Sequence, residues 1–201
     1  MKNTKSLICN ILLCILEIIG LVVLYKDTGI LYEYYTVDSN ILCLVSSLLM
    51  VIFLLKNKKI PRWLSFFKYI STVSLAITFI VVIFILIPMT SFNFKYLLFE
   101  NALLYQHLLC PILAIITFVF FDQLGNFEVK DTIKGLLFTF IYTIVLIPLN
   151  LFDIVLGPYP FLMVKEQTIF MDLIWFFIMM GISTLISFIL LKSYMRKVLT
   201  K

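Results

Sequence analysis

Long apolar runs follow one another along the whole chain and are separated by short polar segments. A helix needs about 20 mostly apolar residues to cross the roughly 30 Å of bilayer hydrocarbon, and runs of this length recur from end to end. The pattern predicts spans at residues 6–25, 36–55, 67–89, 99–121, 132–151 and 168–191. The expected fold class is therefore an all-α polytopic membrane protein, a bundle of about six transmembrane helices forming a single transmembrane domain over residues 1–201.

Composition leaves the bilayer as the solvent of this chain. Hydrophobic residues make up 63% of it and charged residues 13%, with a mean hydropathy of +1.12, so no segment remains for a water-soluble domain. The first apolar run follows Lys2 and Lys5 as a signal peptide would, but it carries Glu17 and no small-residue cleavage site, so we interpret it as a retained span. The cysteines fall inside spans without a C-x-x-C pair, which indicates core thiols, and we expect no metal and no cofactor.

Basic residues predict the orientation. With six spans, 13 of the 16 lysines and arginines fall on one side, and Lys26, Lys95 and Lys165 fall on the other. The positive-inside rule then predicts that both termini are cytoplasmic, in a bacterial-type plasma membrane. The larger set is Lys2, Lys5, Lys56, Lys58, Lys59, Arg62, Lys68, Lys130, Lys134, Lys192, Arg196, Lys197 and Lys201. The net charge of +5 therefore faces lipid headgroups, so membrane lipids are the expected partners and nucleic acid is not.

The second span begins with an unusual polar cluster. Its purely apolar stretch, residues 41–55, would extend only about 22 Å as a helix, which is too short to cross. The helix must therefore start upstream and carry polar residues at membrane depth: Thr36, Asp38, Ser39 and Asn40. At 100° per residue Thr36, Asn40, Cys43 and Ser47 form one stripe, which we expect to face protein or water. The alternative is an ordinary polar helix start, with Thr36 or Ser39 as the N-cap.

The fourth span holds the single histidine, His107, four residues before Pro111. Proline has no N–H for the carbonyl of His107, so a kink and a free acceptor are expected beside the imidazole. Histidine suits general-base chemistry near neutral pH, and the alternative is a histidine bonded to a neighbouring helix for packing. Cys110 is a possible alternative nucleophile, one turn away.

Two further features each leave two interpretations open. Glu17, in the middle of the first span, either makes a structural polar contact or supports a proton path. The segment Gly157-Pro158-Tyr159-Pro160 on the outer side forms a rigid turn. This turn either caps a cavity in the outer leaflet or anchors its aromatic rings at headgroup level.

Three short motifs together resemble the androgen-induced-gene family, which includes animal membrane hydrolases and bacterial Pr6Pr membrane proteins. They are Thr36-x-x-Ser39-Asn40 at the start of the second span, His107 four residues before Pro111, and Tyr159-Pro-Phe-Leu in the outer loop. Chain length and span count also resemble that family. The animal members are six-span hydrolases of fatty acid esters of hydroxy fatty acids that use a threonine nucleophile and a histidine.

The resemblance implies a lipid-ester hydrolase with Thr36 as nucleophile and His107 as base. Asp38, Ser39, Asn40, Pro111 and Tyr159 would then support the site or bind substrate, and a fatty-acid ester is the implied substrate. Two other functions remain open from the residues alone: a small transporter that uses Glu17, Asp38 and His107, and a non-catalytic membrane scaffold. Oligomeric state is not predicted.

Overall fold

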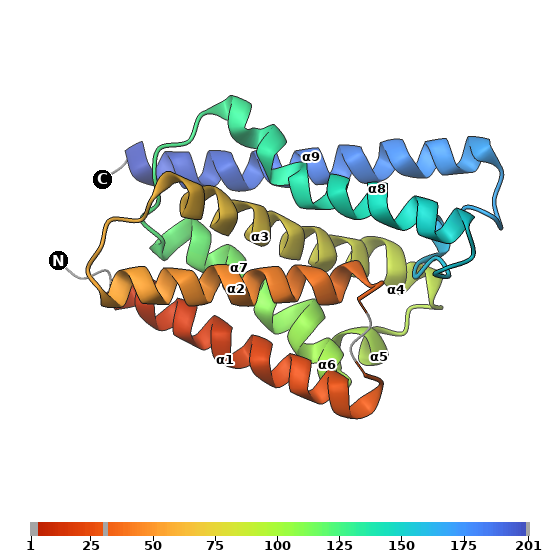
Figure 1. Ribbon diagram of the computed structural model, residues 1–201, viewed down its shortest axis with the longest axis horizontal. Coiled ribbons are helices and arrows are strands. Elements are labelled where there is room, and N and C mark those ends of the chain that lie inside the picture. The colour runs from red at the N-terminus through yellow and green to blue at the C-terminus, as the bar shows by residue number, and fades with distance from the viewer. Residues whose placement is uncertain (1–3, 30–31, 200–201) are drawn as a thin grey trace.

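The computed structural model describes residues 4–29 and 32–199, and within these ranges helices are the only regular secondary structure. Six helical stretches are long and apolar enough to cross a membrane: Thr4–Asp27, Tyr35–Leu55, Arg62–Met89, Asn101–Phe121, Val129–Leu151 and Ile169–Val198. The expected all-α bundle of about six spans is confirmed. The first helix begins and the last one ends at the same end of the bundle, on the left in Figure 1.

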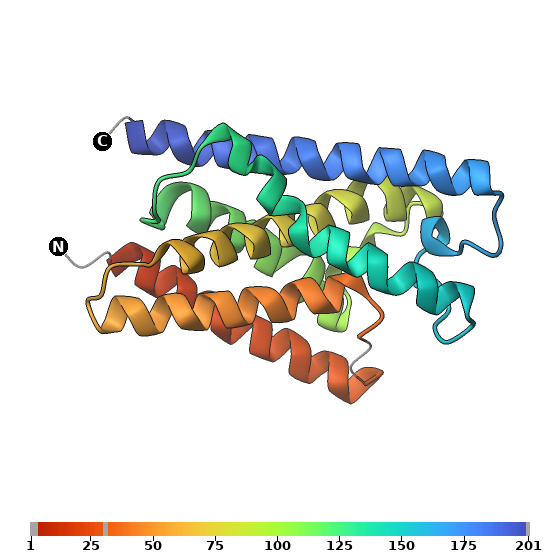
Figure 2. The same cartoon turned by 45° about the horizontal axis from the view of Figure 1, so that its top comes forward.

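The elements follow one another as antiparallel helices with short connections (Figures 1 and 2). The first three spans are α1 (Thr4–Asp27), α2 (Tyr35–Leu55) and α3 (Arg62–Val81), the last continuing into the π-helical η1 (Val82–Leu86) and α4 (Ile87–Met89). A short α5 (Phe94–Phe99) precedes the fourth span, which comprises α6 (Asn101–Leu103), η2 (Leu104–Leu109), α7 (Cys110–Ile116) and η3 (Thr117–Phe121). The remainder is η4 (Val129–Leu136), α8 (Leu137–Leu151), η5 (Pro160–Leu162) and α9 (Ile169–Leu199).

The outside of the bundle carries large exposed apolar side chains along its helices, such as Ile15, Phe84, Ile144 and Phe177. In water such a surface would be unfavourable, but it suits contact with lipid chains. α3 lies in the interior and is the most buried of the six spans. In both views it runs between α2 and α9 (Figures 1 and 2). The surface of the bundle is therefore more apolar than that of a soluble bundle, and many polar side chains are buried inside it.

α3 begins at Arg62, after Pro61, rather than near residue 67. This earlier start changes the position of Lys68, which lies in the second turn of α3 and is completely buried. The assignment of Lys68 to a cytoplasmic flank was therefore wrong. The physical reason is helical phase: the polar residues Ser65, Lys68 and Thr72 share one face of α3, and that face points into the protein.

α1 approaches the fourth span unusually closely. A Cβ atom on Gly20 would lie 2.8 Å from the Cβ of Tyr105 in η2, so only glycine fits at this crossing. This contact brings Glu17, one turn earlier on the same face of α1, close to the fourth span. Glu17 is 1% exposed.

Candidate functional site

The loop between α8 and α9 folds over the start of α2, and its Tyr159 bonds to Thr36. The Thr36 side-chain oxygen lies 3.1 Å from the Tyr159 hydroxyl, and the Thr36 backbone N–H donates to the same phenol oxygen at 3.3 Å. This phenol satisfies one of the N–H groups that every helix leaves free in its first turn. Tyr159 and Phe161 are both buried, so the loop caps the interior, in agreement with the first of its two interpretations.

The N-cap interpretation of the α2 polar cluster is not supported. The N-cap of α2 is Tyr34, and no side chain caps it. Ser39 instead donates its hydroxyl to the Thr36 carbonyl at 2.9 Å. The expected stripe is confirmed as inward-facing, because all of its members are buried: Thr36, Asn40, Cys43 and Ser47.

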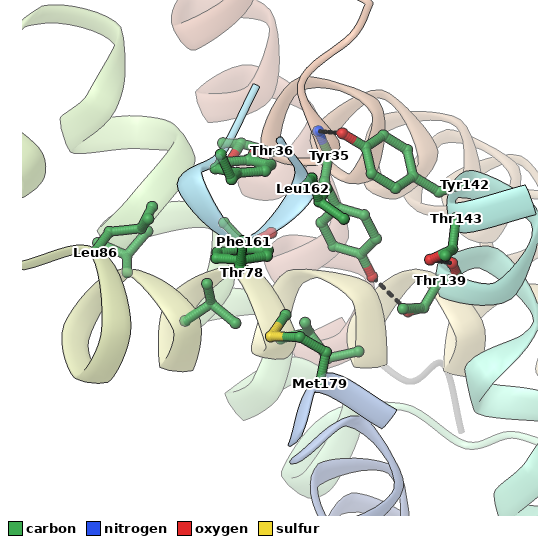
Figure 3. Close-up of a pocket in the computed structure, with 14 residues that line it drawn as sticks. Tyr35, Thr36, Thr78, Leu86, Thr139, Tyr142, Thr143, Phe161, Leu162 and Met179 are labelled. Atoms are coloured by element: carbon green, nitrogen blue, oxygen red, sulfur yellow. Dashed lines mark hydrogen bonds between the residues drawn. The ribbon is translucent and has the colours of Figure 1, made fainter. Parts of the chain in front are cut away.

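Thr36 lines a small cavity between α2, α3, α8 and the loop between α8 and α9 (Figure 3). The cavity volume is about 60 Å³, and its walls are mostly apolar with a few hydroxyl groups. Tyr35 borders it and is fixed at both ends: its N–H donates to the Tyr142 hydroxyl at 3.1 Å, and its own hydroxyl lies 2.8 Å from the Thr139 hydroxyl oxygen. Leu162 and Met179 close the cavity toward α9.

A larger cavity lies on the other side of the Tyr142 ring. Its volume is about 490 Å³, and α8 supplies most of its apolar wall, including Phe138, Val145 and Leu149. Glu33 and Asp38 add two carboxyl groups to its rim. Asp38 therefore faces this second space, because it lies two residues after Thr36, about 200° around α2 from the stripe that contains Thr36.

His107 sits in the π-helical segment η2 and is 5% exposed. Pro111 lies four residues on and has no N–H to offer the His107 carbonyl, so a widened π turn fits the local sequence. The Nδ1 atom of His107 lies 2.7 Å from the carbonyl oxygen of Leu97. A carbonyl oxygen only accepts, so Nδ1 carries the hydrogen, and in the neutral ring Nε2 keeps a lone pair.

The structure brings the turns that carry Thr36 and His107 together but does not pair their side chains. Within residues 4–29 and 32–199 no hydrogen bond joins the two. Asn40 bridges them instead: its Nδ2 donates to the Thr36 carbonyl at 2.7 Å and to the Gln106 carbonyl at 3.3 Å. A backbone carbonyl, that of Leu97, and not a carboxylate, accepts from Nδ1 of His107 and orients the imidazole.

Tyr159 keeps its proton under ordinary conditions. Burial raises the pKa of its hydroxyl to about 12, because removing the phenolate from water outweighs the two hydrogen bonds with Thr36. The phenol is therefore a neutral hydrogen-bond donor at any physiological pH.

Sequence reasoning missed two polar residues that the fold places deep inside. The Lys68 ammonium donates to the Ser47 hydroxyl at 2.7 Å. Asp122, directly after η3, is completely buried and accepts hydrogen bonds from Ser6 and Asn10 of α1. The spacing of polar residues along α3 was the available signal for Lys68, whereas the pairing of Asp122 with α1 crosses more than half of the chain and leaves no local pattern.

The chain was compared with protein-family models, with curated proteins and with solved structures, and none of the three comparisons gave a match.

Proposed function

We propose that this protein is an integral membrane hydrolase of lipid or fatty-acid esters, with Thr36 as nucleophile and His107 as general base. The observation that carries the proposal is the bridge made by Asn40, which ties the turn of Thr36 to the carbonyl preceding His107 across two helices. The resemblance of the Thr36, His107 and Tyr159 motifs to the androgen-induced-gene family supports the same pair.

The imidazole has the tautomer that this chemistry requires. Nδ1–H is held by the Leu97 carbonyl, so Nε2 is free to take a proton. The Thr36 hydroxyl is hydrogen-bonded to Tyr159 in the structure. For the reaction, the Thr36 hydroxyl must instead form a hydrogen bond with the His107 imidazole, directly or through a water. Such catalytic bonds are commonly unformed before substrate binds.

The steps then follow those of hydroxyl nucleophiles in general. The Thr36 oxygen attacks the ester carbonyl carbon while its proton passes to His107, and the imidazolium returns that proton to the leaving alcohol. Water then attacks the acyl-threonine with the same base and releases the fatty acid. Tyr159, neutral and adjacent to Thr36, is the donor available to stabilise the oxyanion.

The surroundings of Thr36 suit an amphiphilic substrate. The cavity at Thr36 holds little more than the reacting ester group, and the 490 Å³ space beyond Tyr142 has the apolar lining an acyl chain needs. We further propose that this site faces the outer leaflet of a bacterial-type plasma membrane with both termini cytoplasmic. Without Lys68, twelve of the 13 basic residues assigned to the cytoplasmic side still support that orientation.

The test is hydrolysis of fluorogenic fatty-acid esters by the purified protein in lipid nanodiscs. Thr36→Ala and His107→Ala should each lower kcat by about a thousandfold or more, and Tyr159→Phe by about a hundredfold. Thr90→Ala is the matched control, because the Thr90 hydroxyl bonds only to backbone carbonyls of its own helix end. Full activity in Thr36→Ala or His107→Ala protein that is correctly folded would remove the proposed pair.

Labelling with a fluorophosphonate lipid probe gives a second measurement that does not require the natural substrate. Wild-type and Thr90→Ala proteins should label on Thr36, as located by peptide mass spectrometry, and His107→Ala should not. Absence of labelling in the wild-type protein, together with absence of ester turnover, would contradict the hydrolase.

A further inference from the structure

Buried polar atoms without a partner gather on one internal interface. Among the described residues, seven buried side-chain nitrogen or oxygen atoms have no hydrogen-bond partner. Two of them, on Asp172 and Ser183, belong to α9. The other five lie between α1, α2 and the fourth span: Asn10 Oδ1, Glu17 Oε1, Asn40 Oδ1, Gln106 Nε2 and Asp122 Oδ2. Buried polar atoms are nearly always bonded to protein or ordered water, so this clustering indicates a hydrated interior.

Lys68 adds a cation to the same interface. Its side chain is completely buried, and within the part of the chain that the structure describes its ammonium makes one hydrogen bond, to Ser47. Among the described residues no carboxylate forms an ion pair with it, although its charge acts on both Glu17 and Asp122. An ammonium has three donors, so two of them remain for water. Ionisable groups at this depth are expensive unless they serve a path for ions or protons.

The inner end of the interface is Asp122, at the end of the bundle where α1 begins and α9 ends. Its Oδ1 accepts from Ser6 at 2.5 Å and from Asn10 at 3.0 Å, and its Oδ2 has no protein partner. A cavity of about 180 Å³ adjoins Asp122 and is also lined by Lys197. Burial raises the pKa of the Asp122 carboxyl above its usual range, because the lost solvation outweighs the Lys68 charge and the two hydrogen bonds.

Glu17 lies further into the bundle, two helical turns beyond Asn10 on α1. Each surrounding helix presents a polar or titratable group to its carboxyl: Cys43 from α2, Lys68 from α3 and Cys110 from α7. Beyond it, toward the opposite end, come Gln106 and Asn40, and Asn40 reaches the carbonyl of Thr36. The polar groups thus continue from one end of the bundle to the other.

We propose that this polar column, defined by Asp122, Lys68, Glu17, Gln106 and Asn40, is a proton pathway through the membrane, with Glu17 as its central relay. A proton enters at Asp122, passes through bridging water to the Glu17 carboxylate, and leaves through water held by Gln106 and Asn40. Glu17 is restored after each transfer, so the chain undergoes no net change.

The experiment uses the purified full-length protein in liposomes that contain a pH-sensitive dye, with a potassium gradient and valinomycin to set the potential. Wild-type vesicles should acidify at a rate proportional to the amount of protein, and Glu17→Gln should lower that rate by about tenfold or more. Asp172→Asn is the matched control: it removes another acid with an unpartnered buried oxygen, but on α9, and should leave the rate unchanged. Wild-type flux equal to that of protein-free vesicles would overturn the proposal, as would undiminished flux in Glu17→Gln.

If the Glu17→Gln variant does not fold, chemical modification of Glu17 in the wild-type protein provides a second test. Dicyclohexylcarbodiimide adds to protonated carboxyls in apolar surroundings, and the adduct retains every atom of both reactants. Treatment of the wild-type proteoliposomes should stop proton flux in proportion to the adduct on Glu17, measured by peptide mass spectrometry. Complete modification of Glu17 with unchanged flux would overturn the proposal.

Discussion

Two buried clusters in this bundle contain polar side chains, and they differ in how completely those side chains are bonded. At the end of the bundle where α9 ends, the rings of Tyr69, Phe118, Phe127 and Tyr194 pack against one another with centroids 5.1 to 6.4 Å apart. We call these four residues the ring cluster. Its two phenols bond to backbone groups, whereas four of the five side chains of the polar column each have one buried atom without a hydrogen-bond partner among the described residues.

The bonding of the ring cluster is complete in detail. The Tyr69 hydroxyl donates to the Ser187 carbonyl at 3.0 Å, while the Ser187 hydroxyl donates to the Thr132 carbonyl at 2.7 Å. The Tyr194 hydroxyl accepts from the Leu124 N–H at 2.8 Å and donates to the Leu124 carbonyl at 3.1 Å. A closed network of this kind fixes one packing of the helices. The ring cluster therefore holds the fold, whereas the column retains bonding capacity that can serve a function.

The largest loss of stability is expected from Phe118→Ala. Phe118 is completely buried and contacts the other three rings of the cluster, so its removal leaves a void on several sides. We expect a loss of about 3 to 5 kcal/mol in unfolding free energy. Denaturant unfolding in mixed micelles measures it, and a loss below about 1 kcal/mol would mean that the ring cluster does not hold the fold.

A smaller loss is expected from Gly135→Ala. A Cβ atom at this position would lie 2.3 Å from the Ser187 hydroxyl oxygen and 3.0 Å from the Tyr69 hydroxyl oxygen. Both hydroxyls are already engaged, so the new methyl group must disrupt the network, at a cost of about 1 to 3 kcal/mol. Gly181→Ala on α9 is the control, because nothing lies within 4 Å of its Cβ position. Equal unfolding midpoints for the two variants would contradict the tight packing.

Tyr69→Phe tests the hydrogen bonds of the ring cluster without changing its packing. The variant removes the phenol that donates to the Ser187 carbonyl, and should lower the unfolding free energy by about 1 kcal/mol. Proton flux and ester hydrolysis should stay at wild-type rates. Loss of either activity in folded Tyr69→Phe protein would contradict a purely structural role of the ring cluster.

The smallest effect on stability is expected from Glu17→Gln, in the column. Glu17 Oε1 has no hydrogen-bond partner among the described residues, and the side-chain oxygen of a glutamine can still accept from the nearby Cys43 and Cys110 thiols. The unfolding free energy should therefore change by less than about 1 kcal/mol while proton flux falls. Substitution in the ring cluster should thus lower stability and leave activity unchanged, whereas substitution of Glu17 should lower proton flux and leave stability nearly unchanged. A loss of several kcal/mol in Glu17→Gln would assign Glu17 a structural role.

The sequence predicted some of these features and not others, for physical reasons. Span number and the inward stripe from Thr36 to Ser47 follow from hydropathy and helical phase, which are local properties. Lys68 was misassigned because a lysine near the start of an apolar run is ordinarily a flank, and the inward phase of α3 was not used. The contacts of Thr36 with Tyr159 and of Asp122 with Ser6 join segments far apart in the chain, so no local spacing predicts them.

The most direct test of the difference between the two clusters is hydroxyl-radical footprinting of the protein in nanodiscs, because radiolysis generates radicals from buried water as well as from bulk water. Cys43 and Cys110 report on the column, and Tyr69 and Phe118 on the ring cluster; each rate is normalised to that of the denatured protein. We expect rapid modification of the two cysteines and protection of the two rings, although all four side chains are buried. Equal protection at all four positions would show a dry column and contradict this expectation.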